Sequence, residues 1–155
     1  MGKRGAPEIF RPIEPISAAI AIFNSHKVKI TVHGGADAPH ILGYSADLNT
    51  AMVNLLVNAV YWLEQSAIPD PKIDISLVTR GGELVILVED NGPGVPAEFS
   101  PRIFDAGFSL KEGGTGLGLN IAREAIARSG GVLGFHVEHE NGALFEMRFD
   151  VGGKK

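Results

Sequence analysis

A polar stripe crosses an otherwise apolar stretch of the sequence. Asn54, Asn58, Tyr61 and Gln65 are spaced by four, three and four residues, so they would share one face of a helix. An outward, solvated face would explain such a stripe. Asparagine is nevertheless a mediocre helix former, because its amide competes with the backbone. Its amide oxygen is also a hard ligand that suits Mg²⁺ when a substrate supplies the other oxygens.

A second unusual stretch is an apolar run, residues 84–88, that leads directly into acids and a glycine-rich turn. Asp90 stands where the predicted strand leaves the core, and Gly92 and Gly94 would let another group approach the backbone closely. A tight turn after a strand would account for the glycines as well. A buried carboxylate needs hydrogen-bond donors, and a base with an exocyclic amino group would supply one.

The third stretch is rich in glycine and precedes a predicted helix: Gly113, Gly114, Gly116 and Gly118. Free N–H groups at a helix start, together with the helix dipole, bind phosphate. The stretch is not the dinucleotide fingerprint, because Leu119 takes the place of its last glycine, and it has no Walker A lysine. Lys111 could add a positive charge there or lie in solvent.

The hydrophobic pattern predicts the elements that must position these groups. Helices are expected over 14–24, 45–65 and 116–129, a helical turn near 97–103, and strands over 27–33, 73–77, 84–89, 133–137 and 145–151. Ser45 is the expected helix cap and Gly130 the expected helix stop, while 34–44 reads as a loop. Gly81-Gly82 and Asn141-Gly142 are the expected two-residue hairpin turns.

Alternating strands have one buried and one exposed face, so the fold class expected is α+β. We expect a two-layer α/β sandwich, with a mixed sheet of about five strands and the helices on one face. At 155 residues the chain fits one domain, drawn as a flexible segment 1–12, a folded domain 13–151 and a tail 152–155.

The composition limits the classes of partner and compartment. The net charge of −4 gives no indication of a nucleic-acid partner or of direct membrane contact, so an anionic ligand must be held by local groups. The sequence contains no cysteine, which excludes disulfides and thiol catalysis and suits the cytoplasm. No apolar run approaches the ~20 residues of a membrane span.

The three stretches occur in the order "NLLVNA" (54–59), "DNGPG" (90–94) and "GTGLGL" (114–119). In this order they resemble the ATP-binding catalytic domain of the histidine kinases, within the GHKL group that also includes gyrase, the heat-shock chaperone and mismatch-repair ATPases. The resemblance extends over residues 13–151 and implies the Bergerat ATP-binding fold, with ATP and Mg²⁺ as ligands.

The resemblance implies a role for each residue of the polar stripe. Asn58 would hold Mg²⁺ through its side-chain oxygen, and Asn54 would face the phosphates or the waters of the metal. Tyr61 stands where many kinases of the family have a lysine, so it offers a hydrogen bond but no charge at the phosphates. More of the phosphate binding would then depend on Lys111, which with Asn54 and Asn58 makes up the candidate catalytic set.

The resemblance likewise assigns the base, the lid and the phosphates. Asp90 would accept a hydrogen bond from the adenine amino group, with Gly92 and Gly94 giving the base room. The lid would be residues 103–114, anchored by Phe104 and Phe108, with Ser109 reaching toward phosphate. Gly107 and Leu110 depart from the family's lid pattern. Backbone N–H groups would bind the triphosphate from Gly114, Thr115, Gly116, Leu117, Gly118 and Leu119.

The implied activity is transfer of the γ-phosphate of ATP to a histidine on a separate dimerisation and phosphoacceptor domain, with a response-regulator receiver downstream. None of the five histidines has the family's acceptor pattern, so the acceptor would lie elsewhere in the parent chain or in trans. Asn54 replaces the glutamate that activates water in the hydrolytic branches, and an asparagine cannot act as a general base. Slow hydrolysis and little activity are therefore expected of the domain alone, as a monomer.

Three alternatives remain open on the sequence. The chain could be a stand-alone nucleotide-binding switch of the GHKL type, in which ATP drives lid closure and dimerisation. It could be a serine kinase of the anti-sigma-factor kind. It could also be a degenerate domain that only binds ATP, an alternative supported by Tyr61.

Overall fold

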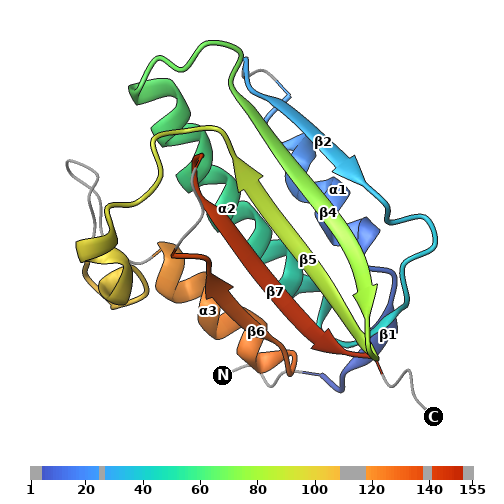
Figure 1. The fold of residues 1–155 in the computed structure, drawn as a ribbon. Coiled ribbons are helices and arrows are strands. Elements are labelled where there is room, and N and C mark those ends of the chain that lie inside the picture. Colours follow the sequence, from blue (N-terminus) through green and yellow to red (C-terminus); the bar gives the residue numbers. More distant parts are fainter. Residues whose placement is uncertain (1–4, 25–26, 109–117, 138–140, 152–155) are drawn as a thin grey trace.

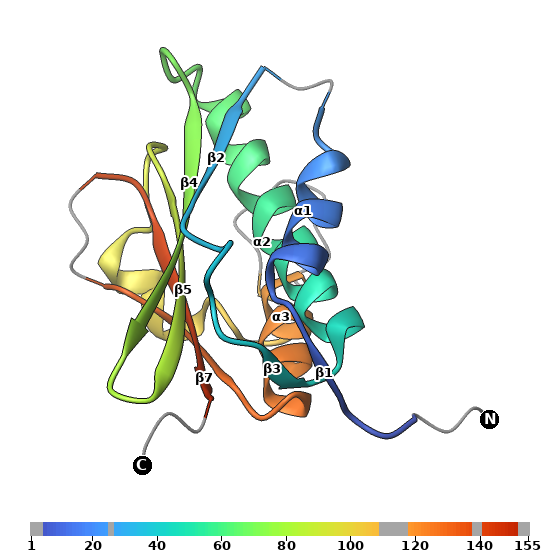
Figure 2. The same cartoon turned by 90° about the vertical axis from the view of Figure 1, so that its right-hand side faces the viewer.

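The computed structural model describes residues 5–24, 27–108, 118–137 and 141–151. In these residues the helices pack on one face of a sheet, and Figure 2 shows the two layers edge-on. The elements in chain order are β1 (Glu8–Phe10), α1 (Ile13–Ala21), β2 (Lys29–His33), β3 (Ile41–Gly43), α2 (Ser45–Gln65), β4 (Lys72–Arg80), β5 (Glu83–Asp90), the 3₁₀ helix η1 (Ala97–Arg102), α3 (Gly118–Arg128), β6 (Val132–Phe135) and β7 (Leu144–Asp150).

The main sheet of the described residues has five strands in the order β2-β4-β5-β7-β6, as Figure 1 shows. β2 runs parallel to β4, whereas β4 and β5, β5 and β7, and β6 and β7 pair antiparallel. The sheet is therefore mixed, and the helices α1, α2 and α3 cover the same face of it (Figure 2). The predicted two-layer sandwich is confirmed.

The core lies between the sheet and α2, the helix that runs between α1 and α3 in Figure 1. Ile75 of β4, Ile86 of β5 and Met147 of β7 are each 0% exposed, and Ile86 lies opposite Met147 across the ladder. One face of α2 is also buried: Leu48, Met52, Leu55, Ala59 and Leu63. Because that face is covered, the polar stripe must point away from the sheet.

The first predicted hairpin is confirmed and the second is wrong. Arg80 lies opposite Glu83 across Gly81 and Gly82, which have φ of +53° and +85°. β6 and β7, however, pair with Phe135 opposite Phe145. Because these two paired residues are ten positions apart in the sequence, the connection between the strands is longer than a two-residue Asn-Gly turn.

A short ribbon of strands differs from the prediction. β3 lies within 34–44, which the sequence predicts to be loop, and it pairs with β1, which lies in the segment predicted to be flexible. The cause is burial of one side chain from each strand, Phe10 and Ile41, against the helices. Strands of three residues are too short to show the alternation by which strands are recognised.

The helix boundaries follow the prediction with two exceptions. α1 ends at Ala21 rather than at residue 24, although Phe23 is still buried in the core. Ser45 does not cap α2, because the cap position is Tyr44 and its side chain makes no capping hydrogen bond. At the end of α3 the predicted stop is confirmed, since Gly130 has φ of +80° and its N–H donates to Ala127 O at 2.9 Å.

Candidate functional site

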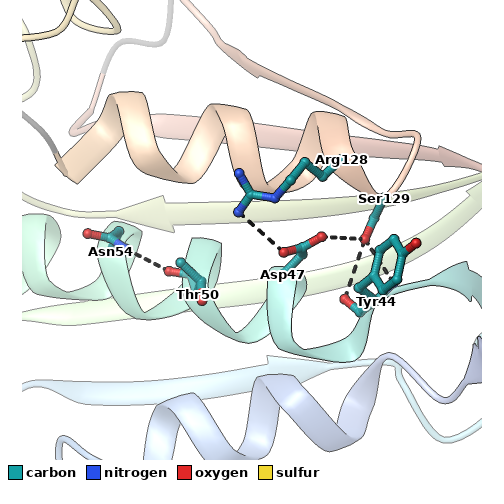
Figure 3. Close-up of polar contacts among 6 residues, drawn as sticks. All are labelled: Tyr44, Asp47, Thr50, Asn54, Arg128 and Ser129. Atoms are coloured by element: carbon teal, nitrogen blue, oxygen red, sulfur yellow. Dashed lines mark hydrogen bonds and ion pairs between the residues drawn. The ribbon is translucent and has the colours of Figure 1, made fainter. Parts of the chain in front are cut away.

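The polar stripe lies on the uncovered face of α2. Asn54, Asn58 and Tyr61 are all half-buried, while Gln65 is exposed at the end of the helix. The Asn54 side-chain amide donates to the carbonyl of Thr50 at 2.8 Å, as Figure 3 shows. A Cβ on Gly118 would lie 3.4 Å from Asn54 Oδ1, so the start of α3 is in contact range of that oxygen.

Asn58 lies one turn further along the same face. Within the described part of the chain its side chain makes no hydrogen bond, although Asn58 is only partly exposed. A half-buried amide without a protein partner must be satisfied by water or by a ligand. Tyr61 follows, and its ring packs edge-on against Trp62 with 5.0 Å between the ring centroids.

The Asp90 carboxylate is held by backbone N–H groups at the end of β5. Its Oδ1 accepts from Gly92 N at 2.8 Å and from Ala143 N at 3.3 Å. The backbone N–H of Asp90 in turn donates to Ala143 O at 3.0 Å. Such bonds fix the direction in which the carboxylate points, which a side chain that recognises a base requires.

The two glycines after Asp90 are needed by the protein itself. A Cβ on Gly92 would lie 3.0 Å from Asp90 Oδ1 and 3.4 Å from Leu63 Cδ2 of α2. Gly94 has φ of +79°, and a Cβ there would lie 3.0 Å from the carbonyl oxygen of Gly142. The expected role of Gly92 and Gly94 in giving a base room remains a prediction.

Together these contacts define a strip along α2. Leu63, at one end, touches the turn that follows Asp90, and Asn54, at the other end, faces the start of α3. The nine residue steps from Asn54 to Leu63 span roughly 14 Å of helix. The carboxylate, the amide pair and a helix start are therefore arranged along the length of α2, with Asn58 between the two ends.

The described part of the predicted lid is attached to the core. The Phe104 ring lies edge-on to Phe145, 6.2 Å between centroids, and the Arg123 guanidinium lies 5.1 Å from the Phe104 ring. Phe108 packs against Phe99 at 5.9 Å. Both aromatic residues thus contact the body of the domain, as the predicted anchoring requires.

Part of the predicted phosphate-binding set lies outside the described residues: Ser109, Lys111, Gly114, Thr115, Gly116 and Leu117. Of the remaining members, Gly118 begins α3 in the described part of the chain, and Leu119 is half-buried against the core. The structure thus describes the helix start beside Asn54 but not the glycines that precede it.

A comparison with protein families identifies the family to which this chain belongs. Residues 43–153 match the model of the family described as histidine kinase-, DNA gyrase B-, and HSP90-like ATPase. The chain belongs to this family. The matched range includes α2, the Asp90 turn and α3, so it contains the whole strip described above.

The relatives of this ATPase-family domain are sensor proteins. Sensor protein CitS of Halalkalibacterium halodurans is 40% identical over 101 residues, covering 64% of this chain and 19% of that protein. A probable C4-dicarboxylate sensor kinase of Bacillus subtilis is 34% identical over 110 residues, covering 70% of this chain and 21% of that protein. The chain spans about a fifth of the length of these curated relatives.

Solved structures support the fold. The catalytic domain of histidine kinase ThkA superposes with a TM-score of 0.80 at 23% identity, covering 95% of this chain and 97% of that one. The mycobacterial sensor histidine kinase MprB superposes with a TM-score of 0.77 at 22% identity, covering 93% of this chain and 97% of that one. These similarities confirm the expected fold.

Three residues of the ATPase-family domain that position the site were not predicted. Asn91 Oδ1 accepts from Lys72 N at 2.9 Å and its amide donates to Asp70 O at 3.0 Å, which ties the Asp90 turn to β4. Asn120 donates to Phe104 O at 3.2 Å, which ties the lid to α3. The third is Gly142, which lies beside Asp90. Its local sequence, Asn-Gly, indicates only a hairpin turn and gives no signal of this contact.

A buried polar network joins α2 to α3 at the end of the ATPase-family domain opposite the Asp90 turn. Asp47 is 2% exposed, and Arg128 Nη2 lies 3.3 Å from its Oδ1. Ser129 Oγ accepts the Tyr44 N–H at 2.9 Å and donates to Asp47 Oδ2 at 3.2 Å (Figure 3). These bonds fix the beginning of α2 against the end of α3, and so the distance between the helices.

The other polar groups of the described residues form no metal site. In the part of the chain that the structure describes, no three His, Asp or Glu side chains are grouped as a metal site. His33 pairs with Asp74 and His136 with Glu146, each at 2.8 Å on partly exposed side chains. Among the same residues, no helix has the length and apolar character that crossing a membrane requires.

Proposed function

We propose that this chain is the ATP-binding catalytic domain of a sensor histidine kinase. It binds Mg-ATP along α2 and presents the γ-phosphate to a histidine on a separate phosphoacceptor domain. The observation that carries the proposal is the arrangement of the Asp90 turn and the start of α3 at the two ends of the Asn54–Leu63 strip. This arrangement occurs in a chain whose family is the ATPase family and whose relatives are named as sensor kinases.

In this proposal the base lies at the Asp90 end. The Asp90 carboxylate accepts the adenine amino group, while Gly92 and Gly94 leave room for the ring. Asn58 supplies an oxygen to Mg²⁺, which fits a half-buried amide without a partner among the described residues. The bound metal would neutralise charge on the phosphates.

The phosphates lie at the other end of the strip. Asn54 faces them from α2, and Tyr61 is proposed to offer them a hydrogen bond from the turn of α2 beyond Asn58. The proposed N–H donors are those of Gly118 and Leu119 at the start of α3. The others belong to residues outside the described part of the chain: Gly114, Thr115, Gly116 and Leu117. Lys111 and Ser109 of the lid, which lie outside the described residues, are the further proposed phosphate ligands, with Phe104 and Phe108 as the anchors of the lid.

The proposed chemistry depends on positioning. The described part of the strip offers amides, a carboxylate and a helix start, and Asn54 cannot deprotonate water. Phosphoryl transfer needs mainly alignment and charge stabilisation, which a domain of this kind can provide once the acceptor histidine is brought to it. We therefore expect slow hydrolysis, a monomeric isolated domain, and a receiver domain downstream of the phosphohistidine. ATP is a cytoplasmic substrate, so we expect the proposed activity in the cytoplasm.

Nucleotide binding is the first test. Titration of a non-hydrolysable ATP analogue, followed by calorimetry, is expected to show binding that Mg²⁺ strengthens. Absence of binding at millimolar analogue would contradict the proposal and all the nucleotide-dependent alternatives.

Phosphotransfer is the second test. The chain, in its parent protein or mixed with a histidine-bearing helical acceptor domain, is incubated with γ-labelled ATP. The expected product carries a label that acid removes and base leaves in place, as a phosphohistidine does. An acid-stable label would instead indicate a serine kinase. A bound nucleotide with neither label nor lid-dependent dimerisation would indicate a domain that only binds ATP.

A further inference from the structure

The segment that precedes β7, residues 142–143, lies directly alongside Asp90. β5 and β7 pair up to Glu89 opposite Leu144, and Asp90 and Ala143 then continue the contact. The Asp90 N–H donates to Ala143 O at 3.0 Å, and the Ala143 N–H donates to the Asp90 carboxylate at 3.3 Å. One residue of this segment therefore holds both the backbone and the side chain of Asp90.

Gly142 permits this close approach. Its φ is +88°, and a Cβ at this position would overlap the carbonyl group of Asp90. The carbonyl oxygen of Gly142 also lies 3.0 Å from the position a Cβ on Gly94 would take. Gly142 therefore packs against both ends of the turn 90–94, and any larger residue must separate β5 from this segment.

The opposite side of the turn is held independently by Asn91, whose side chain bonds to the backbone of Lys72 and Asp70. Displacement of Gly142 would therefore leave the turn attached to β4 while removing the Ala143 N–H from the carboxylate. The consequence would fall on the direction of the Asp90 side chain rather than on the existence of the turn.

We propose that Gly142 and Ala143 position the Asp90 carboxylate and thereby determine the preference of the site for an adenine nucleotide. The inference rests on the proposed role of Asp90 as the acceptor of the adenine amino group. Gly142 and Ala143 act through Asp90 and are positioning residues. A carboxylate whose direction is not fixed would still bind purine triphosphates but would distinguish them poorly, because selection requires alignment with one exocyclic group.

The test compares ATP with inosine triphosphate, in which a carbonyl oxygen replaces the amino group. The ratio of the two dissociation constants is measured for the wild type, Asp90→Asn, Gly142→Ala and Gly130→Ala. Gly130 is the matched control, because its φ is +80° and a Cβ there would meet nothing within 4 Å. Both glycine variants therefore place a side chain at positive φ, but only Gly142→Ala introduces an overlap with Asp90.

Gly142→Ala is expected to lower the preference for ATP by about tenfold, the effect of losing one hydrogen bond to a charged group. Gly130→Ala is expected to leave the preference within about twofold of the wild type. If Gly142→Ala kept the wild-type preference for ATP while Asp90→Asn lost it, the inference would be overturned and the role of Asp90 would stand. Equal binding of both nucleotides by the wild type would instead overturn the role of Asp90, and the inference with it.

A measurement on the wild type covers the case in which Gly142→Ala does not fold. The amide signals of Ala143 and Gly92 are followed by nuclear magnetic resonance while pH is lowered through the titration of the Asp90 carboxyl group. The chemical shifts of both amides are expected to change over the same pH range as that of the Asp90 carboxyl carbon. In Asp90→Asn neither amide is expected to show this change. An Ala143 amide that does not follow Asp90 would overturn the inference.

Discussion

Replacement of Asp90 by asparagine tests the base-reading role most directly. Oδ1 of the wild-type carboxylate accepts from two backbone N–H groups, those of Gly92 at 2.8 Å and Ala143 at 3.3 Å. Both donors require an acceptor, so the side-chain amide introduced by Asp90→Asn must place its oxygen at that position. Its NH₂ group then occupies the place of the second carboxylate oxygen and changes an acceptor into a donor.

The magnitude follows from this exchange. A hydrogen bond to a charged group contributes about 1.5–3 kcal/mol, and a donor left facing another donor costs about 1–3 kcal/mol. The two costs add to about 2.5–6 kcal/mol, so ATP affinity should fall by at least about 70-fold. The carbonyl of inosine triphosphate gains a donor in the variant, so its affinity should stay level or rise, and the preference between the two nucleotides should invert.

The assay is calorimetric titration of both Mg-nucleotides at one salt concentration. Asp37→Asn is the control, because Asp37 is exposed in the segment between β2 and β3 and its replacement changes the net charge equally. Urea unfolding of each variant establishes that the fold is retained. A wild-type preference for ATP in Asp90→Asn would refute the assignment of Asp90 to the adenine amino group.

Further variants test the rest of the strip and its supports. Asn58→Ala should abolish the strengthening of nucleotide binding by Mg²⁺, whereas Gln65→Ala, exposed at the end of the same helix, should retain it; an undiminished Mg²⁺ effect in Asn58→Ala would contradict the metal assignment. Ser129→Ala removes the donor to buried Asp47 and should lower the free energy of unfolding by about 1–3 kcal/mol without altering the ATP preference, which urea unfolding and titration would check. Asn120→Ala, which removes the hydrogen bond to the carbonyl of Phe104 in the lid, should weaken ATP binding by up to about tenfold and leave adenosine binding unaffected. Equal losses of affinity for both ligands would show that the lid is not involved.

Local patterns predicted most of the architecture. The alternation of apolar residues in β4 and β7, the apolar run of β5 and the helical spacing in α2 depend on neighbours within a few residues, so they are visible in the sequence. The Gly81-Gly82 turn is of this kind, because it joins strands that adjoin it directly. The order of the three stretches around Asn58, Asp90 and Gly118 likewise indicated the family that the comparison then confirmed.

The sequence could not decide contacts between segments far apart in the chain. β1 pairs with β3 more than 30 positions away, because Phe10 and Ile41 share a buried place that exists only once the helices have packed. Ser129 completes the bonds of Asp47 and Tyr44, although its own neighbourhood suggests only the end of a helix.

The end of β5 shows the same division. The sequence by itself determined that an apolar strand ends in a carboxylate and a glycine-rich turn. Only the tertiary structure decided which groups hold that carboxylate, because Ala143 lies 53 positions further along the chain. An Asn-Gly pair such as 141–142 has the local chemistry of a hairpin turn, and only its packing against the carbonyl of Asp90 gives Gly142 its place beside the site.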